Sequence, residues 1–291
     1  MWSLYPGASA RLLIDDVKQL PPNAFGNAEM NLFQEQYKIS LLQRMIVGGF
    51  NVHKLKVTKR FKNESLLAIC RIVNCDNSIQ EAPDCFQPKW DRIMKNHNKE
   101  EMGVEAPVAF IHVHNNWVQT ADGGSRYSKD TATVTIRNVL QFLKRGATPE
   151  LCTIITPYTA QVNLLRRMVQ QADGSGITDY PFVWDKLRKV TIKTIDSYMG
   201  NENRYVWVDT CGHPGHLLDD VGDPGRPKEY PRTVVAFTRA TSGMVVVGEW
   251  NHEWQRKHGS NHPYIRMVKY MIEKRFYVQV VVSGGGYRRL K

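Results

Sequence analysis

Short apolar runs recur along the chain between longer stretches in which apolar residues return every three or four positions. Runs without polar alternation are typical of strands buried on both faces, as in a parallel sheet. The intervening stretches have the period of amphipathic helices, so strands and helices alternate. The sequence therefore predicts an α/β fold with a parallel sheet and flanking helices. The expected strands are Arg11–Asp15, Val108–His112, Cys152–Thr156, Val190–Thr194, Tyr205–Asp209 and Met244–Gly248.

Four stretches have apolar residues at the spacing of amphipathic helices. Two of them end at glycine, at Gly48-Gly49 and at Gly146, as helices commonly do. A β-rich run follows the last stretch, whereas Asp76–Gly103 and Gly212–Pro231 have the composition of loops. The helix stripes are Met30, Phe33, Tyr37, Leu41 and Met45; Ala132, Ile136, Val139 and Leu143; Leu164, Leu165, Met168 and Val169; and Ile265, Val268, Met271 and Ile272.

The composition narrows the class of protein. With 42% hydrophobic and 23% charged residues among 291, neither disorder nor a collagen-like structure fits. No apolar run approaches the roughly 18 residues of a membrane span. Five cysteines without a CxxC pair indicate a reducing compartment. We therefore expect an intracellular protein, cytoplasmic or nuclear, with no membrane partner.

The net charge of +11 is unevenly distributed, because residues 251–291 hold nine Lys and Arg against two acidic residues. Basic side chains that neutralise phosphates release condensed counterions, so the charge favours a polyanionic partner such as nucleic acid. A basic protein without such a partner is the alternative, since charge alone does not decide between them.

Two groups of residues have side chains that bind metals elsewhere. Cys211, His213 and His216 are close in sequence, but no second ligand pair accompanies them, so a polar loop is favoured over a zinc site. His112 and His114 would share one face of a strand, where histidines held by hydrogen bonds are more common than ligands. We therefore expect no metal site.

Polar segments follow or precede several expected strands, and ligands of open α/β sheets bind outside the carboxyl ends of strands. Asp15–Pro22 has the sequence DDVKQLPP, and Thr156–Gln161 has the sequence TPYTAQ and opens a helix. Thr194–Glu202 has the sequence TIDSYMGNE, and Val235–Ala240, before the last expected strand, has the sequence VAFTRA. Amide groups at the start of such a helix can face phosphate.

This ordered set resembles the C-terminal half of superfamily one helicases, in particular the nonsense-mediated-decay (up-frameshift) helicase group. The resemblance extends from about Ser9 to about Trp250. The corresponding family motifs are GDxxQLPP, a hinge YRM that matches Lys59-Arg60-Phe61, TPYxxQ, TVDxFQGxE and NVALTRAR. The resemblance implies a RecA-like sheet of the P-loop NTPase type, in which two such domains clamp ATP between them.

The resemblance also implies roles for individual residues. Arg60 and Arg239 would neutralise charge that develops on the γ-phosphate of ATP, for which a planar guanidinium is well shaped. A surface ion pair is the alternative for either arginine. The residues expected to contact the nucleotide are Gln19, Gly200 and Glu202. The residues expected to contact a single-stranded nucleic acid, without regard to its sequence, are Pro157, Tyr158, Gln161 and Thr194.

Five departures from the family pattern bear on the expected chemistry. Asp15 stands in place of Gly, Lys59 of the Tyr expected to stack on a base, Met199 of Gln, Val234 of Asn and Thr241 of Arg. The sequence also lacks a GxxxxGK[ST] motif, which in the family precedes these segments together with a magnesium-binding Asp-Glu pair. We therefore expect ATP as the cofactor, with Mg²⁺ supplied by a missing first domain, and little ATP hydrolysis by this chain alone.

These observations predict a domain organisation and a function. Residues 1–57 are expected to be the remnant of a first RecA-like domain, residues 58–250 a second one, and residues 251–291 a basic helical tail. The expected function is that of the C-terminal domain of an ATP-dependent helicase, with single-stranded RNA or DNA and other RNA-processing proteins as partners. The alternatives are a non-catalytic nucleic-acid-binding module or diverged helicase fragment, and a scaffold that docks proteins through residues 76–103.

Overall fold

The chain divides into two units, residues 1–54 and residues 55–291, which are described separately. The structure is a computed structural model. It describes residues 12–14, 16–20, 33, 36, 39–86, 88–171, 181–212, 230–251, 256–283 and 286–290. Within these residues no helix is both long and apolar enough to cross a membrane.

The first unit contains helix α2 (Leu41–Val47), which is the C-terminal part of the helix expected around residues 30–45. Ser40 caps it, because its side chain accepts a hydrogen bond from the Gln43 amide at 3.1 Å. The chain leaves α2 through Gly49, whose φ of 81° lies in the left-handed region that favours glycine. Of the other stripe residues, Phe33 lies in a turn, and Met30 and Tyr37 lie outside the described residues.

The strand expected at residues 11–15 is wrong for Leu12–Ile14, which have no regular structure. Leu12 and Ile14 are both exposed. A strand of a parallel sheet depends on neighbouring strands and on helices that cover it, and the described residues of this unit supply neither. Arg11 and Asp15 lie outside the described residues.

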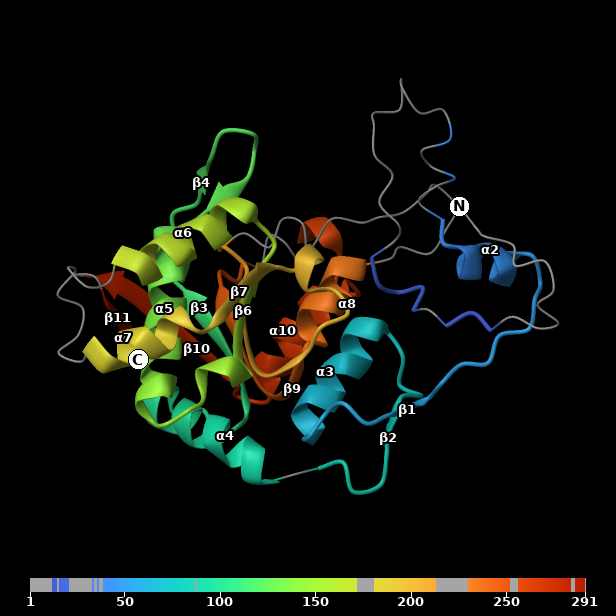
Figure 1. The fold of residues 1–291 in the computed structure, drawn as a ribbon, viewed down its shortest axis with the longest axis horizontal. Helices are drawn as coiled ribbons and strands as arrows, with labels where there is room; N and C mark the ends of the chain where they lie inside the picture. Colours follow the sequence, from blue (N-terminus) through green and yellow to red (C-terminus); the bar gives the residue numbers. More distant parts are fainter. Residues whose placement is uncertain are drawn as a thin grey trace. The chain divides into compact units, whose positions relative to one another are not determined.

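A seven-stranded sheet forms the centre of the second unit, with the strand order β11-β10-β3-β9-β8-β6-β7 (Figure 1). Every neighbouring pair is parallel except β10 with β11. Five of the strands match expected ones, which confirms the predicted α/β class. The strands are β3 (Val108–Val113), β6 (Cys152–Thr156), β7 (Thr191–Thr194), β8 (Asn203–Asp209), β9 (Ala240–Gly248), β10 (Tyr277–Ser283) and β11 (Gly286–Arg289).

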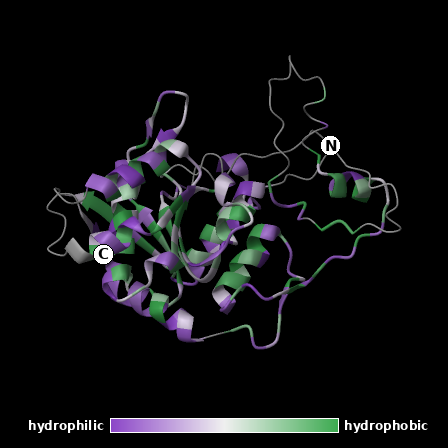
Figure 2. Cartoon of the chain, viewed as in Figure 1, coloured by the Kyte–Doolittle hydropathy of each residue, from purple (hydrophilic) through white to green (hydrophobic). Residues whose placement is uncertain are grey.

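Helices cover both faces of this sheet, which explains why β3 and β6 are buried along their whole length (Figure 1). One set packs together as α5 (Lys129–Lys144), α6 (Thr159–Gln171) and α7 (Pro181–Arg188), with α4 (Pro88–Met102) against α5. The other set is α3 (Glu64–Asn74), α8 (Pro231–Phe237) and α10 (Pro263–Glu273). Figure 2 shows hydrophobic residues concentrated along the central strands. The short elements are β1 (Val57–Thr58), β2 (Gln80–Glu81), β4 (Gln119–Thr120), β5 (Arg126–Tyr127), η1 (Pro149–Leu151) and η3 (Asp196–Tyr198).

The loop expected at residues 76–103 is wrong, because most of this segment forms β2 and α4. The buried side of α4 consists of Met94, His97, Asn98 and Met102, which have helical spacing. Two of these four residues are polar, so the apolar stripe that identifies a helix in the sequence is faint. In the other expected loop, residues 213–229 lie outside the described residues, and Pro231 begins α8.

Residues 251–291, expected as a basic helical tail, form a helix followed by two strands that extend the sheet. The helix is α10, and β10 pairs in parallel with β3, with Tyr277 opposite Phe110. Tyr264, Ile265 and Val268 of α10 are fully buried. The described part of this segment therefore contributes to the core of the second unit, because α10 packs against α3 and β3, while Arg256, Lys257, Lys274 and Arg275 are exposed.

Candidate functional site

The predicted site residues of the second unit lie at two opposite edges of the sheet. Because the strands from β10 to β7 are parallel, their amino ends share one edge and their carboxyl ends share the other. Glu202 directly precedes β8 and Arg239 directly precedes β9, at the amino edge. Pro157 directly follows β6 and Thr194 ends β7, at the carboxyl edge. The structure therefore separates the residues predicted for ATP from those predicted for nucleic acid.

At the amino edge, Arg60 is held by two groups. Its Nε lies 2.6 Å from Oε2 of Glu202, and its Nη1 donates to the carbonyl oxygen of Thr238 at 3.1 Å. The Arg60 and Glu202 side chains are 31% and 49% exposed. An ion pair this exposed to water contributes on the order of 0 to 1 kcal/mol to stability, so an anion can compete with Glu202 for the guanidinium at little cost.

Arg239, in contrast, is a buried guanidinium that fastens the neighbouring chain segments. Its Nη1 donates to the carbonyl oxygen of Asn201 at 3.3 Å, and its Nη2 donates to Oγ1 of Thr238 at 2.8 Å. Its own carbonyl accepts from the Asn203 amide at 3.1 Å. Arg239 therefore links the turn after η3 to the end of α8, the same two segments that hold Arg60 through Glu202 and Thr238.

Gly200 makes the turn that places Glu202 and Asn201. Its φ is 81°, and a Cβ built on it would have open space around it. The backbone conformation, and not a lack of room, is therefore what requires glycine here. The carbonyl that Arg239 binds belongs to the next residue, so Gly200 acts on the site through the backbone.

A cationic cavity of about 270 Å³ opens beside Arg60 and Glu202. It contains four cationic side chains and one carboxylate, a balance that favours a polyphosphate. The sequence did not identify Lys62 or Arg204 as site residues. The guanidinium of Arg204 lies 3.5 Å from the ring centroid of Trp90, a cation–π contact made by α4, which had been expected to be a loop. The lining residues are Lys59, Arg60, Lys62, Glu202, Asn203, Arg204 and Thr241.

Gln19, the remaining residue predicted at the nucleotide, belongs to the first unit. Its side-chain amide donates to Oδ2 of Asp16 at 2.8 Å, and its backbone amide donates to the Asp16 carbonyl at 3.0 Å. Asp16 thus closes a turn from residue 16 to residue 19. Gln19 is described within its own unit alone, and its place at the nucleotide stays a prediction.

At the carboxyl edge, Pro157 and Thr194 lie side by side, because Thr156 and Thr194 are paired in the register of β6 and β7. Thr194 accepts from the Ser197 amide at 3.2 Å and donates to its hydroxyl at 2.9 Å, which starts the turn into η3. Both Pro157 and Thr194 are partly exposed, whereas Tyr158 is only 3% exposed. Pro157 and Thr194 are thus the accessible members of the set predicted for nucleic acid.

Gln161, also predicted at the nucleic acid, is fully buried in a polar network. Its amide nitrogen donates to Oδ2 of Asp209 at 2.7 Å and to Oγ1 of Thr131 at 3.1 Å. Its oxygen accepts from the Ser128 amide at 2.8 Å, and Ser128 is the N-cap of α5. Gln161 thereby joins α6, α5 and the carboxyl end of β8. It stabilises the carboxyl edge of the sheet from within the core and does not face a ligand at the surface.

Asp209 at the centre of this network is a buried carboxyl group. Burial raises its pKa to about 6, while the hydrogen bonds from Gln161 and the Cys211 amide oppose the rise. The Cys211 amide donates to Oδ1 at 2.8 Å, and Thr135 lies 3.4 Å from Oδ2. The protonated form of Asp209 is therefore favoured in the folded protein near pH 5.

His112 and Cys211 belong to the two groups of residues that were considered as metal ligands. His112 accepts a hydrogen bond on Nδ1 from the Trp250 amide at 2.7 Å, and burial lowers its pKa to about 4. Cys211 is buried, and burial raises the pKa of its thiol, while His213 and His216 lie outside the described residues. No group of three or more His, Cys, Asp and Glu suited to a metal occurs in the part of the chain that the structure describes. His112 is thus a residue held by hydrogen bonds, as predicted.

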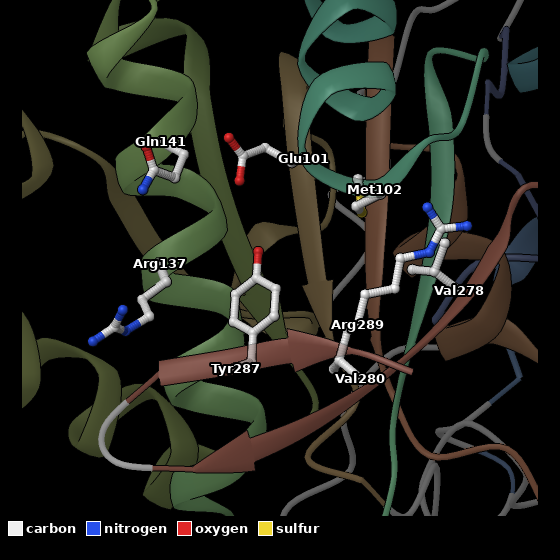
Figure 3. A pocket seen from close by; sticks show the side chains of 8 residues that line it. All are labelled: Glu101, Met102, Arg137, Gln141, Val278, Val280, Tyr287 and Arg289. Atoms are coloured by element: carbon white, nitrogen blue, oxygen red, sulfur yellow. The ribbon is translucent and has the colours of Figure 1, made fainter. Parts of the chain in front are cut away.

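A second cavity, of about 210 Å³, lies around Tyr287, beside the outermost strands β10 and β11 (Figure 3). Its basic residues, Arg137 and Arg289, lie on opposite sides of the Tyr287 ring. The Glu101 carboxylate is bound to Arg145. The polar groups therefore do not converge on one point, and this cavity is less suited to a single anion than the one beside Arg60.

Comparisons with known proteins show which families the chain is similar to. A family model described as an AAA domain matches residues 37–251. A putative regulator of nonsense transcripts 1 from Takifugu rubripes is 28% identical over 211 residues, which are 72% of this chain and 17% of that protein. An ATP-dependent helicase of Schizosaccharomyces pombe is 24% identical over 249 residues, 85% of this chain and 25% of the relative. An uncharacterized ATP-dependent helicase of Methanocaldococcus jannaschii is 23% identical over 255 residues, 85% of this chain and 34% of the relative.

This chain therefore spans from about a sixth to about a third of the length of these relatives. The matches confirm two predictions made from the sequence: the similarity to helicases of the nonsense-mediated-decay group, and a RecA-like fold of the P-loop NTPase type. The roles of individual residues stay predictions.

Proposed function

Because the chain belongs to the AAA domain family, we propose that residues 55–291 act as the second RecA-like domain of an ATP-dependent helicase. In this proposal the amino edge of the sheet contributes arginines to an ATP-binding cleft, and the carboxyl edge contacts single-stranded RNA or DNA. The observation that supports it most directly is the cavity beside Arg60, where four cations surround one carboxylate in front of the strand ends that carry Glu202 and Arg239.

The residues at this cavity fit a triphosphate. Arg60 would exchange its weak contact with Glu202 for the γ-phosphate, where a guanidinium stabilises charge that develops during phosphoryl transfer. Lys59, Lys62 and Arg204 would lower the electrostatic cost of bringing the phosphates close together. ATP, when bound, supplies the phosphoryl group whose transfer would drive translocation of the helicase. None of the described residues of this chain is assigned to its Mg²⁺.

Arg239 is the second proposed arginine, and its surroundings define what it must do. Its contacts to Asn201 and Thr238 hold the two segments that position Arg60. To reach a phosphate, its guanidinium has to exchange these hydrogen bonds for bonds to the nucleotide. We therefore propose that Arg239 supports Arg60 in the nucleotide-free chain and contacts the γ-phosphate only when the cleft is closed.

The competing proposal is a non-catalytic nucleic-acid-binding module, which the basic charge of the chain would also serve. Under that proposal the cavity beside Arg60 has no ligand, and the cations of the surface bind only the phosphate backbone. The two proposals differ in what Arg60 does. It matters for a triphosphate in the first, and it is one cation among many in the second.

Titration of the full chain with a fluorescent ATP analogue, and with the corresponding ADP analogue, tests the proposal. We expect the chain to prefer the triphosphate, and Arg60→Lys to remove this preference, because lysine keeps the charge but lacks the planar fork. Arg188→Lys is the matched control, since Arg188 lies on α7 beside Asp185. The proposal is contradicted if the Arg60 variant keeps the preference of the wild-type chain for the triphosphate, or if the wild-type chain does not bind the triphosphate at all. ATP turnover by the chain alone is expected at background level.

A further inference from the structure

Trp117 is a large aromatic side chain that the fold leaves in water. It is 71% exposed, more than any other Trp, Phe or Tyr among the described residues. It lies between the end of β3 and the hairpin of β4 and β5. An indole buries a large apolar area when it is covered, so leaving one exposed forgoes stabilisation on the order of 25 cal/mol per Å². The stability of the folded chain therefore does not explain why Trp117 is exposed.

The backbone that carries Trp117 is firmly fixed. The Trp117 amide donates to Oδ2 of Asp130 at 3.0 Å, and the side chain of Asn116 is hydrogen-bonded to the Ser128 hydroxyl. Asn116 also packs against Gly212, where an added Cβ would lie 1.7 Å from its amide nitrogen. The loop is thus attached both to the first turn of α5 and to the chain just beyond β8. The exposed indole of Trp117 therefore projects from a backbone that these contacts hold in place.

This support places Trp117 at the carboxyl edge of the sheet. The hairpin lies beside α6, because the Ser125 hydroxyl accepts a hydrogen bond from the Ala160 amide at 3.0 Å (Figure 1). The helix α6 begins two residues after Pro157. Tyr158 and Tyr198, the aromatic residues next to Pro157 and Thr194, are both buried. Neither of them can stack on a base, whereas Trp117 can.

We propose that Trp117 is a base-stacking residue for single-stranded nucleic acid. The inference rests on the proposed function and adds to it a residue that none of the motifs contains. Every base has a π-face, so an exposed indole binds bases without regard to sequence. Arg126 of β5 and Lys129 of α5 are cations of the same segment, and Asp122 and Asp130 balance their charge. The expected contribution of Trp117 is therefore stacking on a base and not local charge.

The test is the binding of a fluorescein-labelled oligothymidylate of about 12 nucleotides by the full chain, followed by anisotropy. We expect Trp117→Ala to weaken binding roughly 5- to 150-fold, which corresponds to about 1 to 3 kcal/mol for one stacked base. Trp117→Phe should recover most of the affinity. The slope of log affinity against log salt should stay unchanged, because stacking releases no counterions. Phe86→Ala is the matched control, since Phe86 is exposed on the β2–α4 segment.

An abasic oligomer of the same length and charge shows whether the loss concerns bases. The wild-type chain should bind it more weakly than oligothymidylate, by about the same factor that Trp117→Ala costs, and the variant should hardly distinguish the two ligands. If the wild-type chain binds but Trp117→Ala binds equally well, or loses affinity for both ligands alike, the stacking role is overturned. If the wild-type chain binds neither ligand, the nucleic-acid face of the proposed function fails, and the stacking role fails with it.

Discussion

Replacing Asp209 by Asn should change how the stability of the protein depends on pH. Asp209 is fully buried at the carboxyl end of β8, and burial raises its pKa from 3.8 to about 6. The folded state therefore binds a proton more tightly at this carboxyl than the unfolded state does. The resulting stabilisation is fully present below about pH 4 and is lost as the pH rises through 6.

A shift of this size corresponds to about 3 kcal/mol, because one pKa unit is worth about 1.4 kcal/mol. Asn has the size of the protonated Asp209 side chain and no charge at any pH. The free energy of unfolding of Asp209→Asn, measured relative to the wild-type chain, should therefore rise by up to about 3 kcal/mol between pH 4 and pH 7. Loss of a hydrogen bond in the variant would shift this difference by a constant and leave its dependence on pH intact.

Urea unfolding followed by tryptophan fluorescence at several pH values in this range gives the free energies directly. Asp185→Asn is the matched control, because Asp185 is exposed on α7, and we expect a difference within about 0.5 kcal/mol at every pH. A constant difference between Asp209→Asn and the wild type would refute the reasoning. It would mean that Gln161 and the Cys211 amide fully compensate the burial of the carboxylate.

Two further predictions concern the core. A Cβ at Gly243 of β9 would lie 2.6 Å from Cγ of Met94, so Gly243→Ala should lower the free energy of unfolding by about 1 to 3 kcal/mol. A loss well below about 1 kcal/mol in a denaturant titration would contradict this. Burial lowers the pKa of His97 to about 4, so its contribution is present above about pH 6.5 and is lost as the pH falls through 4. His97→Gln should therefore lose less stability than the wild type between pH 6.5 and pH 4, and parallel pH profiles would show that His97 does not titrate there.

The central strands could be predicted from the sequence because they are continuous apolar runs. β3, β6, β7, β8 and β9 lie at the predicted positions, shifted by only a few residues at their ends. Helix α4 was missed because half of its buried side is polar, and apolar periodicity does not report polar residues that are buried and hydrogen-bonded. His97 and Asn98 show this, since they bind Asn138 and the Ala106 carbonyl inside the protein.

The candidate site could be predicted only where a motif carried it. The motif segments led to Arg60, Arg239 and Glu202, which the structure brings together, but a motif does not show how deeply a side chain is buried. Gln161 could not be recognised as an internal support, because its partners Ser128 and Asp209 are 33 and 48 residues away in sequence. Trp117 belongs to no motif, and its exposure is a property of the folded chain alone.

The segment from Thr194 to Asn203 crosses from the carboxyl edge of the sheet to the amino edge without a helix of its own, apart from the single turn η3. The strands β7 and β8 that it connects lie on either side of β6, so its two ends are two strand spacings apart across the sheet. Thr194 lies level with Asp209 of β8, six residues along that strand from Asn203. With ideal sheet dimensions the two ends are therefore about 22 Å apart. The nine Cα steps between them include two hydrogen-bonded turns, η3 and the turn that Gly200 makes between Tyr198 and Asn201. A fully extended chain of nine steps would reach about 31 Å, so the segment keeps length in reserve in these turns.

This crossing is anchored in its middle, because the Tyr198 hydroxyl lies 3.2 Å from Oγ1 of Thr153 in β6. The turn at Gly200 lies between this anchor and Glu202. A displacement of Glu202 by a few ångström, as when Arg60 turns from it toward another anion, is therefore expected to open or close this turn. Thr194 lies on the other side of the anchor and should keep its place beside Pro157.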